Sequence, residues 1–223
     1  MFRNLTLAAV AIAGLIGAAI WMNASPRATA GLADLGAANA QEAADVDTSG
    51  IIDMFIGNPD AEVTVIEYAS FTCPHCRSFH ETTYKQLKSD YIDTGKIKFV
   101  MREVYFDRYG LWAGMLARCG GQDRYFGFVD ALFASQADWL ATRDPAGIAD
   151  DLRKLGLTAG LTADEINACL SDSDKAQAMV ALYQENAEAD GIRSTPSFVI
   201  NGENYSNMSF EQFKGVLDEA LGS

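Results

Sequence analysis

The sequence predicts an α/β protein in which a strand–helix–strand unit is followed by a block of helices, a hairpin and a last helix. Val63 to Tyr68 form an apolar, β-branched run that predicts a buried strand, and residues 96–106 alternate in a second strand pattern. Residues 109 to about 190 show no strand pattern. Asn201-Gly202 is a strong two-residue hairpin turn between segments that read as strands. Together these features predict a mixed α/β sandwich with an inserted all-helical block.

Helices are expected wherever apolar residues recur at helical spacing. One should run from Cys73 to about Tyr91, with Gly95 closing the segment. In the inserted block the expected helices are 109–119, 123–140, 145–155, 162–170 and 174–190. Thr162 with Glu165 fits a capping box, and Ser209 with Gln212 fits another, which opens a final helix to Leu221.

Composition places the chain among ordinary globular proteins. Of its 223 residues, 49% are hydrophobic and 21% charged, which is enough apolar surface for a sizeable core. The net charge of −13 argues against binding to nucleic acid through phosphate contacts and against a polybasic membrane surface.

Residues 1–30 have the pattern of an export signal or membrane anchor. Arg3 supplies a positive charge, Leu5 to Met22 are uncharged and apolar, and Ala28-Thr29-Ala30 and Ala38-Asn39-Ala40 resemble cleavage sites. A cleaved signal, an uncleaved anchor and a buried core helix remain as alternatives, and the first two both place the rest of the chain outside the cytosol. Residues 31–50 are expected to form a flexible tether, followed by one domain over 51–223.

Cys73-Pro74-His75-Cys76 carries the chemistry. It lies between a predicted buried strand and a predicted helix, the context in which C-x-x-C is a redox motif. The helix N-terminus offers unpaired N–H groups and the positive end of the helix dipole, which stabilise a Cys73 thiolate and lower its pKa. Pro74 suits the first helical position, and His75 can add a positive charge or a hydrogen bond to the same sulfur. Cys76, one turn deeper, is expected to be the less exposed, resolving thiol.

These cysteines have three alternative uses. A structural zinc site could combine Cys73, Cys76 and His80, but it lacks a fourth ligand, so no metal is expected. Covalent haem needs C-x-x-C-H, and Arg77 occupies the fifth position. A purely structural disulfide is the remaining alternative to a redox-active pair.

Residues 51–223 resemble the DsbA family of exported thiol:disulfide oxidoreductases. The matching residues are Gly57-Asn58-Pro59-Asp60-Ala61, Glu67, the Cys73–Cys76 motif and Thr195-Pro196. The resemblance implies a thioredoxin-like fold with a helical insertion at about 107–190 and no cofactor. It also implies a membrane partner of the DsbB kind that reoxidises the protein through quinone.

The resemblance assigns roles to residues outside the motif. Thr195-Pro196 is expected to be a cis peptide facing the cysteines and binding substrate backbone, the alternative being a trans proline at a strand start. Glu67 is expected to lie beneath the disulfide and help to move the proton of the inner cysteine. The alternative for Glu67 is an ion pair with Lys98 or Arg102 on the next strand.

The remaining notable side chains have simpler interpretations. Cys119 and Cys169 are either bonded to each other, as an oxidising compartment favours, or two buried free thiols. His80 is expected on a helix surface or at the rim of the active site. Core packing is expected for a group of methionines and tryptophans, namely Met101, Met115, Met179, Trp112 and Trp139.

The sequence therefore predicts a periplasmic disulfide oxidase, either soluble after signal cleavage or tethered to the inner membrane. Its expected partners are reduced exported proteins and the quinone-linked reoxidant, and the protein is expected to be a monomer. The first alternative is a disulfide reductase or isomerase on the same fold. Isomerases of this superfamily usually add an N-terminal dimerisation domain, for which about 20 residues after the signal leave no room. The second alternative is a metal-binding module that uses the same thiols.

Overall fold

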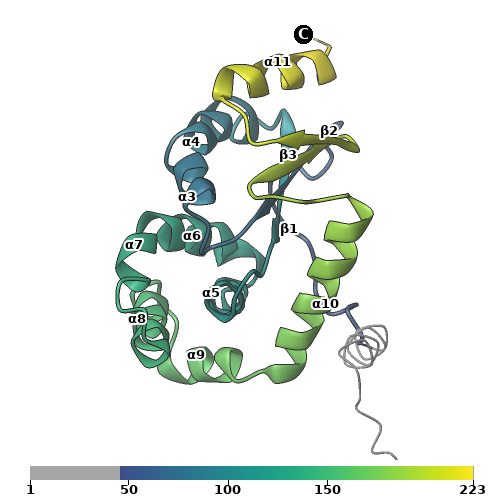
Figure 1. Ribbon diagram of the computed structural model, residues 1–223. Coiled ribbons are helices and arrows are strands. Elements are labelled where there is room, and N and C mark those ends of the chain that lie inside the picture. Colours follow the sequence, from purple (N-terminus) through teal and green to yellow (C-terminus); the bar gives the residue numbers. More distant parts are fainter. Residues whose placement is uncertain (1–45, 223) are drawn as a thin grey trace, which may run out of the picture. The chain divides into compact units, whose positions relative to one another are not determined.

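The computed structural model describes residues 46–222, which form a five-stranded mixed sheet with helices packed on both faces (Figure 1). The sheet order is β1-β3-β2-β4-β5. β2 and β3 are parallel, and the other neighbouring strands are antiparallel. The strands are β1 (Met54–Gly57), β2 (Val63–Ala69), β3 (Ile97–Glu103), β4 (Ser197–Ile200) and β5 (Glu203–Ser206).

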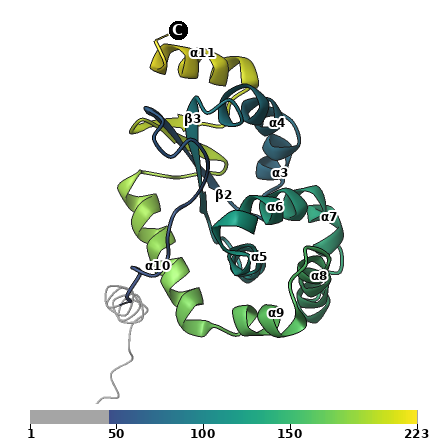
Figure 2. The ribbon, with the colours of Figure 1, turned by 180° about the vertical axis from the view of Figure 1, so that it is seen from behind.

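The helices divide into those beside the sheet and those of the inserted block. Beside the sheet are α3 (Pro74–Glu81), α4 (Thr83–Leu87), the π-helix η1 (Lys88–Ile92) and α11 (Phe210–Ala220). The block contains α5 (Arg108–Cys119), α6 (Gly121–Ala134), α7 (Gln136–Trp139), α8 (Pro145–Thr158), α9 (Ala163–Leu170) and α10 (Ser173–Ala189). Figures 1 and 2 show α5 to α9 gathered at one end of the sheet, with α10 returning the chain to β4.

The two faces of the sheet differ because side chains alternate along each strand. On one face, Val65, Phe99 and Phe198 join the main core, where Phe198 packs edge-on against Phe213 of α11. On the other face, Tyr68 and Val199 form a smaller cluster against α10. Side chains that are neighbours in the sequence of β2 therefore have different surroundings.

Two expected helices are interrupted, and the same interaction occurs at both breaks. The helix expected from Cys73 to Tyr91 breaks at Thr82, whose hydroxyl donates to the Ser78 carbonyl at 2.7 Å. The helix expected over 123–140 breaks at Ser135, whose hydroxyl donates to the Ala131 carbonyl at 2.7 Å. A Ser or Thr side chain that bonds back to the i−4 carbonyl competes with the backbone ladder and bends a helix.

β1 was not predicted. Gly57 ends β1 with φ of +94°, a conformation that favours glycine. A β-carbon there would also collide with the Ile97 carbonyl. This close approach brings β1 alongside β3. A strand of four residues is too short for its sequence pattern to predict that pairing.

Other local predictions are confirmed. Both capping boxes are present, at Thr162 and at Ser209. The hairpin between β4 and β5 turns at Asn201 and Gly202, which have φ of +47° and +90°. All five methionines and tryptophans assigned to the core are buried except Trp112, which is half-buried against it.

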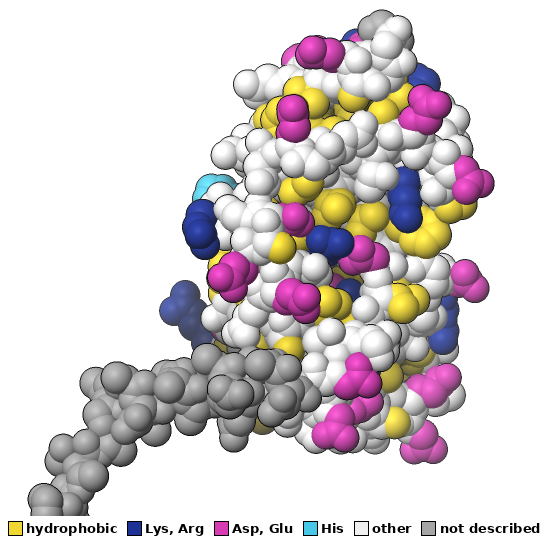
Figure 3. All heavy atoms as spheres, turned by 90° about the vertical axis from the view of Figure 1, so that its right-hand side faces the viewer, with side chains coloured by type: hydrophobic (Ala, Val, Ile, Leu, Met, Phe, Trp, Pro, Cys, Tyr) yellow, Lys and Arg dark blue, Asp and Glu magenta, His cyan; other side chains and the backbone are white. Residues whose placement is uncertain are grey.

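Charged side chains of both signs are mixed on the surface shown in Figure 3, with acidic groups spread over the described part of that face. None of the helices within residues 46–222 is long and apolar enough to cross a membrane. The predicted signal or anchor of residues 1–30, and most of the predicted tether, lie outside the described residues.

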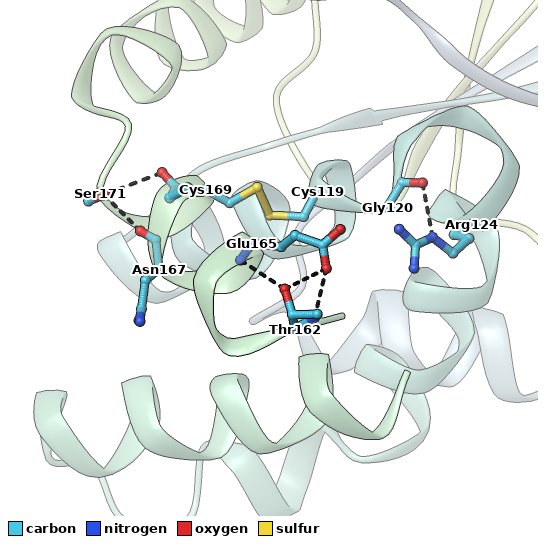
Figure 4. The surroundings of a disulfide bond; sticks show 9 residues. Cys119, Gly120, Arg124, Thr162, Glu165, Asn167, Cys169 and Ser171 are labelled. Atoms are coloured by element: carbon cyan, nitrogen blue, oxygen red, sulfur yellow. Dashed lines mark hydrogen bonds between the residues drawn. A yellow bond between two sulfur atoms is a disulfide. The ribbon is translucent and has the colours of Figure 1, made fainter. Parts of the chain in front are cut away.

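A disulfide joins two helices of the inserted block. Cys119 ends α5 and Cys169 lies in α9, and their sulfurs are 1.98 Å apart (Figure 4). The capping box of Thr162 and Glu165 opens α9 beside this bond. The crosslink closes a loop with a sequence separation of 50 residues.

Replacing both Cys119 and Cys169 by Ala should lower the free energy of unfolding by about 4 kcal/mol, because the chain-entropy model assigns that value to a loop of this length. Urea denaturation of the variant and the parent, both with Cys73–Cys76 reduced, measures the difference. Mass mapping of the parent should find Cys119 bonded to Cys169. Two free thiols there, or equal unfolding free energies, would contradict the crosslink.

Candidate active site

The two motif cysteines lie where β2 passes into α3. The chain leaves β2 at Ala69 and turns so that the Cys73 amide donates to the Ser70 carbonyl at 3.0 Å. Cys73 is the N-cap of α3, and Pro74 follows in the first turn, where a missing N–H costs nothing. The sequence thus places Cys73 at the positive end of a helix.

Cys73 is adapted to carry a negative charge. Its pKa is lowered to about 5, chiefly by a hydrogen bond from the Cys76 thiol, against an opposing effect of burial. The Thr195 side chain and the backbone N–H groups of Cys76 and His75 lower it further. Cys73 is 9% exposed and Cys76 is 0% exposed, so Cys73 is the more accessible residue of the two.

Cys76 has the opposite properties. It is completely buried, and burial raises its pKa far above that of a free thiol. The hydrogen bond to Cys73 and the negative charge of Glu67 raise it further. One thiol of the pair therefore ionises readily while the other keeps its proton.

His75 and Pro74 are both exposed at the start of α3. The sequence assigned the stabilising effect of His75 to its imidazole. In the structure, the contribution of His75 to the lowered Cys73 pKa comes from its backbone N–H. The geometry at the helix N-terminus accounts for this, since any residue other than proline would present a backbone N–H to the sulfur from that position.

Glu67 lies on the main core face of β2 and is completely buried. Its Oε2 is 2.8 Å from Nε2 of His80, which is 5% exposed. The expectation that His80 lies on a helix surface or at the rim is therefore wrong, because α3 turns this side chain inward. An ion pair of Glu67 with Lys98 or Arg102 is also wrong. Arg102 pairs in register with Tyr68, on the opposite face of the sheet, and bonds to Asp53 and Asp190.

Thr195 and Pro196 lie beside Cys73, just before β4. The Thr195–Pro196 peptide bond is cis, and the Cys73 Sγ is 3.6 Å from the Thr195 carbonyl oxygen, to which a thiol can donate. The structure thus brings together Cys73, Cys76 and Thr195 from three distant parts of the sequence. Cys119 and Cys169 lie apart from them, in the inserted block.

Sequence reasoning missed Gln136. This buried amide on α7 donates from Nε2 to the carbonyl oxygens of Phe71 and Cys73, at 2.8 and 3.0 Å. It thereby ties the helical block to the loop that presents Cys73. A glutamine between Ser135 and Ala137 belongs to no motif, so no signal in the sequence could have found it.

Within residues 46–222, no group of three or more His, Cys, Asp or Glu side chains is placed to hold a metal ion. His80, the third member of the alternative zinc site, is hydrogen-bonded to Glu67.

A family model described as thioredoxin matches residues 50–219. The chain belongs to the thioredoxin family. The predicted fold class, a thioredoxin-like fold with inserted helices, is confirmed by solved DsbA structures. One of these, alpha-DsbA1 of Wolbachia pipientis, aligns with a TM-score of 0.68 and 29% identity, over 78% of this chain and 96% of that one.

Two relatives found by sequence comparison are also named for disulfide chemistry. A Rickettsia bellii protein, provisionally named a protein-disulfide oxidoreductase, is 35% identical over 170 residues, which cover 76% of this chain and 64% of that protein. Disulfide bond formation protein D of Bacillus subtilis is 25% identical over 171 residues, covering 74% of this chain and 76% of that protein. The match thus spans less than two thirds of the Rickettsia relative. The chain is a thioredoxin-family protein whose fold is similar to that of DsbA proteins.

Reduced protein should be alkylated at Cys73 with a rate that follows a single titration near pH 5, because the thiolate is the reacting species. Cys76 should stay unmodified up to pH 8, since burial keeps it protonated and out of reach. Iodoacetamide labelling followed by peptide mass mapping measures both sites. Cys73→Ser serves as the control and should leave the protein almost unlabelled. First labelling at Cys76, or a Cys73 titration near that of a free thiol, would reject this assignment.

Proposed function

We propose that the protein is an exported protein-disulfide oxidase that passes the Cys73–Cys76 disulfide to reduced substrate proteins. The observation that carries this proposal is the opposite shift of the two thiol pKa values within one C-x-x-C motif. A stabilised Cys73 thiolate favours the reduced form of the protein, and a protein that favours its own reduction is an oxidant of others. The names of the relatives support the same class of reaction.

In the first step a substrate thiolate attacks Cys73 Sγ of the oxidised protein. The Cys73–Cys76 bond breaks, Cys76 leaves with the electron pair and takes up a proton, and a mixed disulfide forms at Cys73. In the second step another substrate thiolate attacks the substrate sulfur of the mixed disulfide. Cys73 then leaves as a thiolate, and its low pKa makes it a good leaving group.

Surrounding residues serve these steps in the proposal. Pro74 and His75 build the helix start that stabilises the Cys73 thiolate. Thr195 and Pro196 present backbone beside Cys73, against which an extended substrate segment can pair. Glu67 exchanges the proton of Cys76, whose pKa its charge already raises.

The N-terminal sequence supports a location outside the cytosol for this reaction. The apolar run from Leu5 to Met22 supports export, with the domain acting in the periplasm either free or anchored. The substrates are then reduced exported proteins. A quinone-linked membrane protein of the DsbB kind returns the disulfide, and the oxidase works as a monomer.

A direct test of the proposed function is oxidation of a reduced, unfolded protein with two cysteines. Stoichiometric oxidised protein should form the substrate disulfide and become reduced at Cys73 and Cys76. Cys76→Ser cannot form the Cys73–Cys76 disulfide and should not oxidise the reduced substrate. Mixed with the oxidised form of the substrate, its Cys73 thiolate should instead attack the substrate disulfide and accumulate a mixed disulfide, because no second thiol of the enzyme can displace the substrate. Non-reducing electrophoresis and mass spectrometry follow both products. Failure of the wild-type protein to oxidise the substrate would reject the proposal.

The reduced protein should melt at a higher temperature than the oxidised protein at pH 7, because only the reduced form has the Cys73 thiolate. The folded pKa of Cys73 is about 5 and its ordinary value is 9.0. The thiolate's stabilisation is therefore complete only above about pH 9, and it is lost as the pH falls through about 5. Thermal melts of both redox forms between pH 4 and pH 8 should show the gap closing on acidification. An oxidised form that melts higher at pH 7 would favour the reductase alternative.

A further inference from the structure

A groove lies among three helices of the inserted block. α6 and α8 both pack on α5, and α7 joins them at a corner (Figures 1 and 2). The groove between these helices has a volume of about 650 Å³. None of its lining residues belongs to the site of disulfide exchange, so that reaction does not explain it.

The walls of the groove are largely apolar. α6 contributes Gly127 and Ala131, which lie one helical turn apart. Leu155 of α8 and Ala159 at the end of that helix form a second such row, and Trp139 of α7 adds an aromatic ring. Two rows of this kind on neighbouring helices are the surface into which an amphipathic helix lays its apolar face.

No contact within the described residues requires glycine at position 127. A glycine inside a helix destabilises it relative to alanine. Gly114 and Gly156 have a reason in packing, because an added β-carbon would lie 3.0 Å from the Tyr105 ring and 2.8 Å from the Ile166 side chain. A β-carbon at Gly127 would meet no atom within 4 Å. Glycine at this position therefore keeps the α6 side of the groove open at a cost in helix stability.

The polar side chains of the groove offer acceptors rather than donors. The hydroxyl groups of Ser135 and Thr158 each donate to the carbonyl one turn earlier, at 2.7 and 2.9 Å. Lys154 Nζ donates to Asp151 at 2.8 Å. The Asp138 carboxylate has no hydrogen-bond or ion-pair partner among residues 46–222. An occupant that complements this groove therefore brings N–H donors and positive charge.

We propose that the groove binds a basic amphipathic helix of a partner protein. The apolar side of that helix packs against Gly127 and Leu155, and its lysine or arginine side chains pair with Asp138 and Asp151. The net charge of −13 favours the approach of a basic partner over an acidic one. The inference goes beyond the proposed function and does not depend on it, because the groove contains no residue of disulfide exchange.

A synthetic helical peptide of about four turns tests the groove. The peptide carries leucine at i, i+3, i+4 and i+7, lysine at the flanking positions and fluorescein at one end, and a matched peptide has glutamate in place of each lysine. Fluorescence anisotropy should show saturable binding of the lysine peptide to the purified protein and no binding of the glutamate peptide.

Variants of the lining residues locate the binding. Gly127→Leu fills the groove without changing the net charge and should weaken binding of the lysine peptide about tenfold or more. Asp138→Asn removes one carboxylate of the groove and should weaken it about threefold, as for an exposed ion pair. Gly127→Leu should also melt no lower than the wild type, since leucine favours a helix more than glycine does.

Two matched controls lie outside the groove. Gly215→Leu on α11 adds the same side chain where a β-carbon also meets no atom within 4 Å, and Asp174→Asn on α10 removes the same charge. Both variants should bind the lysine peptide as the wild type does. No binding by the wild type, unchanged binding by Gly127→Leu, or an equal loss in the controls would overturn the docking groove. A lower melting temperature of Gly127→Leu would also count against it, since the glycine would then serve the fold.

Discussion

The hydrogen bond from the Cys76 thiol to the Cys73 sulfur is the interaction on which the chemistry of this fold depends. It is the largest contribution that lowers the pKa of Cys73, and it also helps to raise the pKa of Cys76. The bond exists only because one sulfur lies at the start of α3 and the other lies one turn inside it. Residues that fix the start of α3 therefore control the charge on Cys73.

The inserted helices contribute to that control although they bring no thiol to the site. The sequence predicts no role for Gln136 of α7, yet its side-chain amide donates hydrogen bonds to the Phe71 and Cys73 carbonyl groups. The block is fixed in turn by a buried ion pair between Arg118 of α5 and Glu103 of β3, whose Nε and Oε1 atoms are 2.7 Å apart. Arg118 adjoins Cys119, so ion pair and disulfide meet at the end of α5. Through Gln136 the insertion thus supports the active-site loop.

Local chemistry explains which features the sequence predicted. Turns, capping boxes and the start of α3 depend on residues a few positions apart, so Asn201-Gly202, Thr162 and Cys73-Pro74 could be interpreted directly. Thr195 lies 122 positions from Cys73, so no local pattern connects the two residues. Only the family resemblance could assign Thr195 to the site.

Long-range packing explains what the sequence did not predict. His80 was expected on a helix surface or at the rim of the active site, yet α3 turns its side chain toward Glu67. Gln136 needs the tertiary fold to reach the carbonyl groups it binds. The breaks at Thr82 and Ser135 result from a side chain that can bond either to solvent or back to its own helix, and periodicity does not distinguish these cases.

The reduction potential of the Cys73–Cys76 pair tests the central claim most directly. Equilibration with glutathione buffers at pH 7, read by mass spectrometry of alkylated protein, gives the potential. Preferential stabilisation of the Cys73 thiolate predicts a value well above the roughly −270 mV of a reducing thioredoxin. A value at or below that of thioredoxin would show that the thiolate does not stabilise the reduced form and would contradict an oxidase.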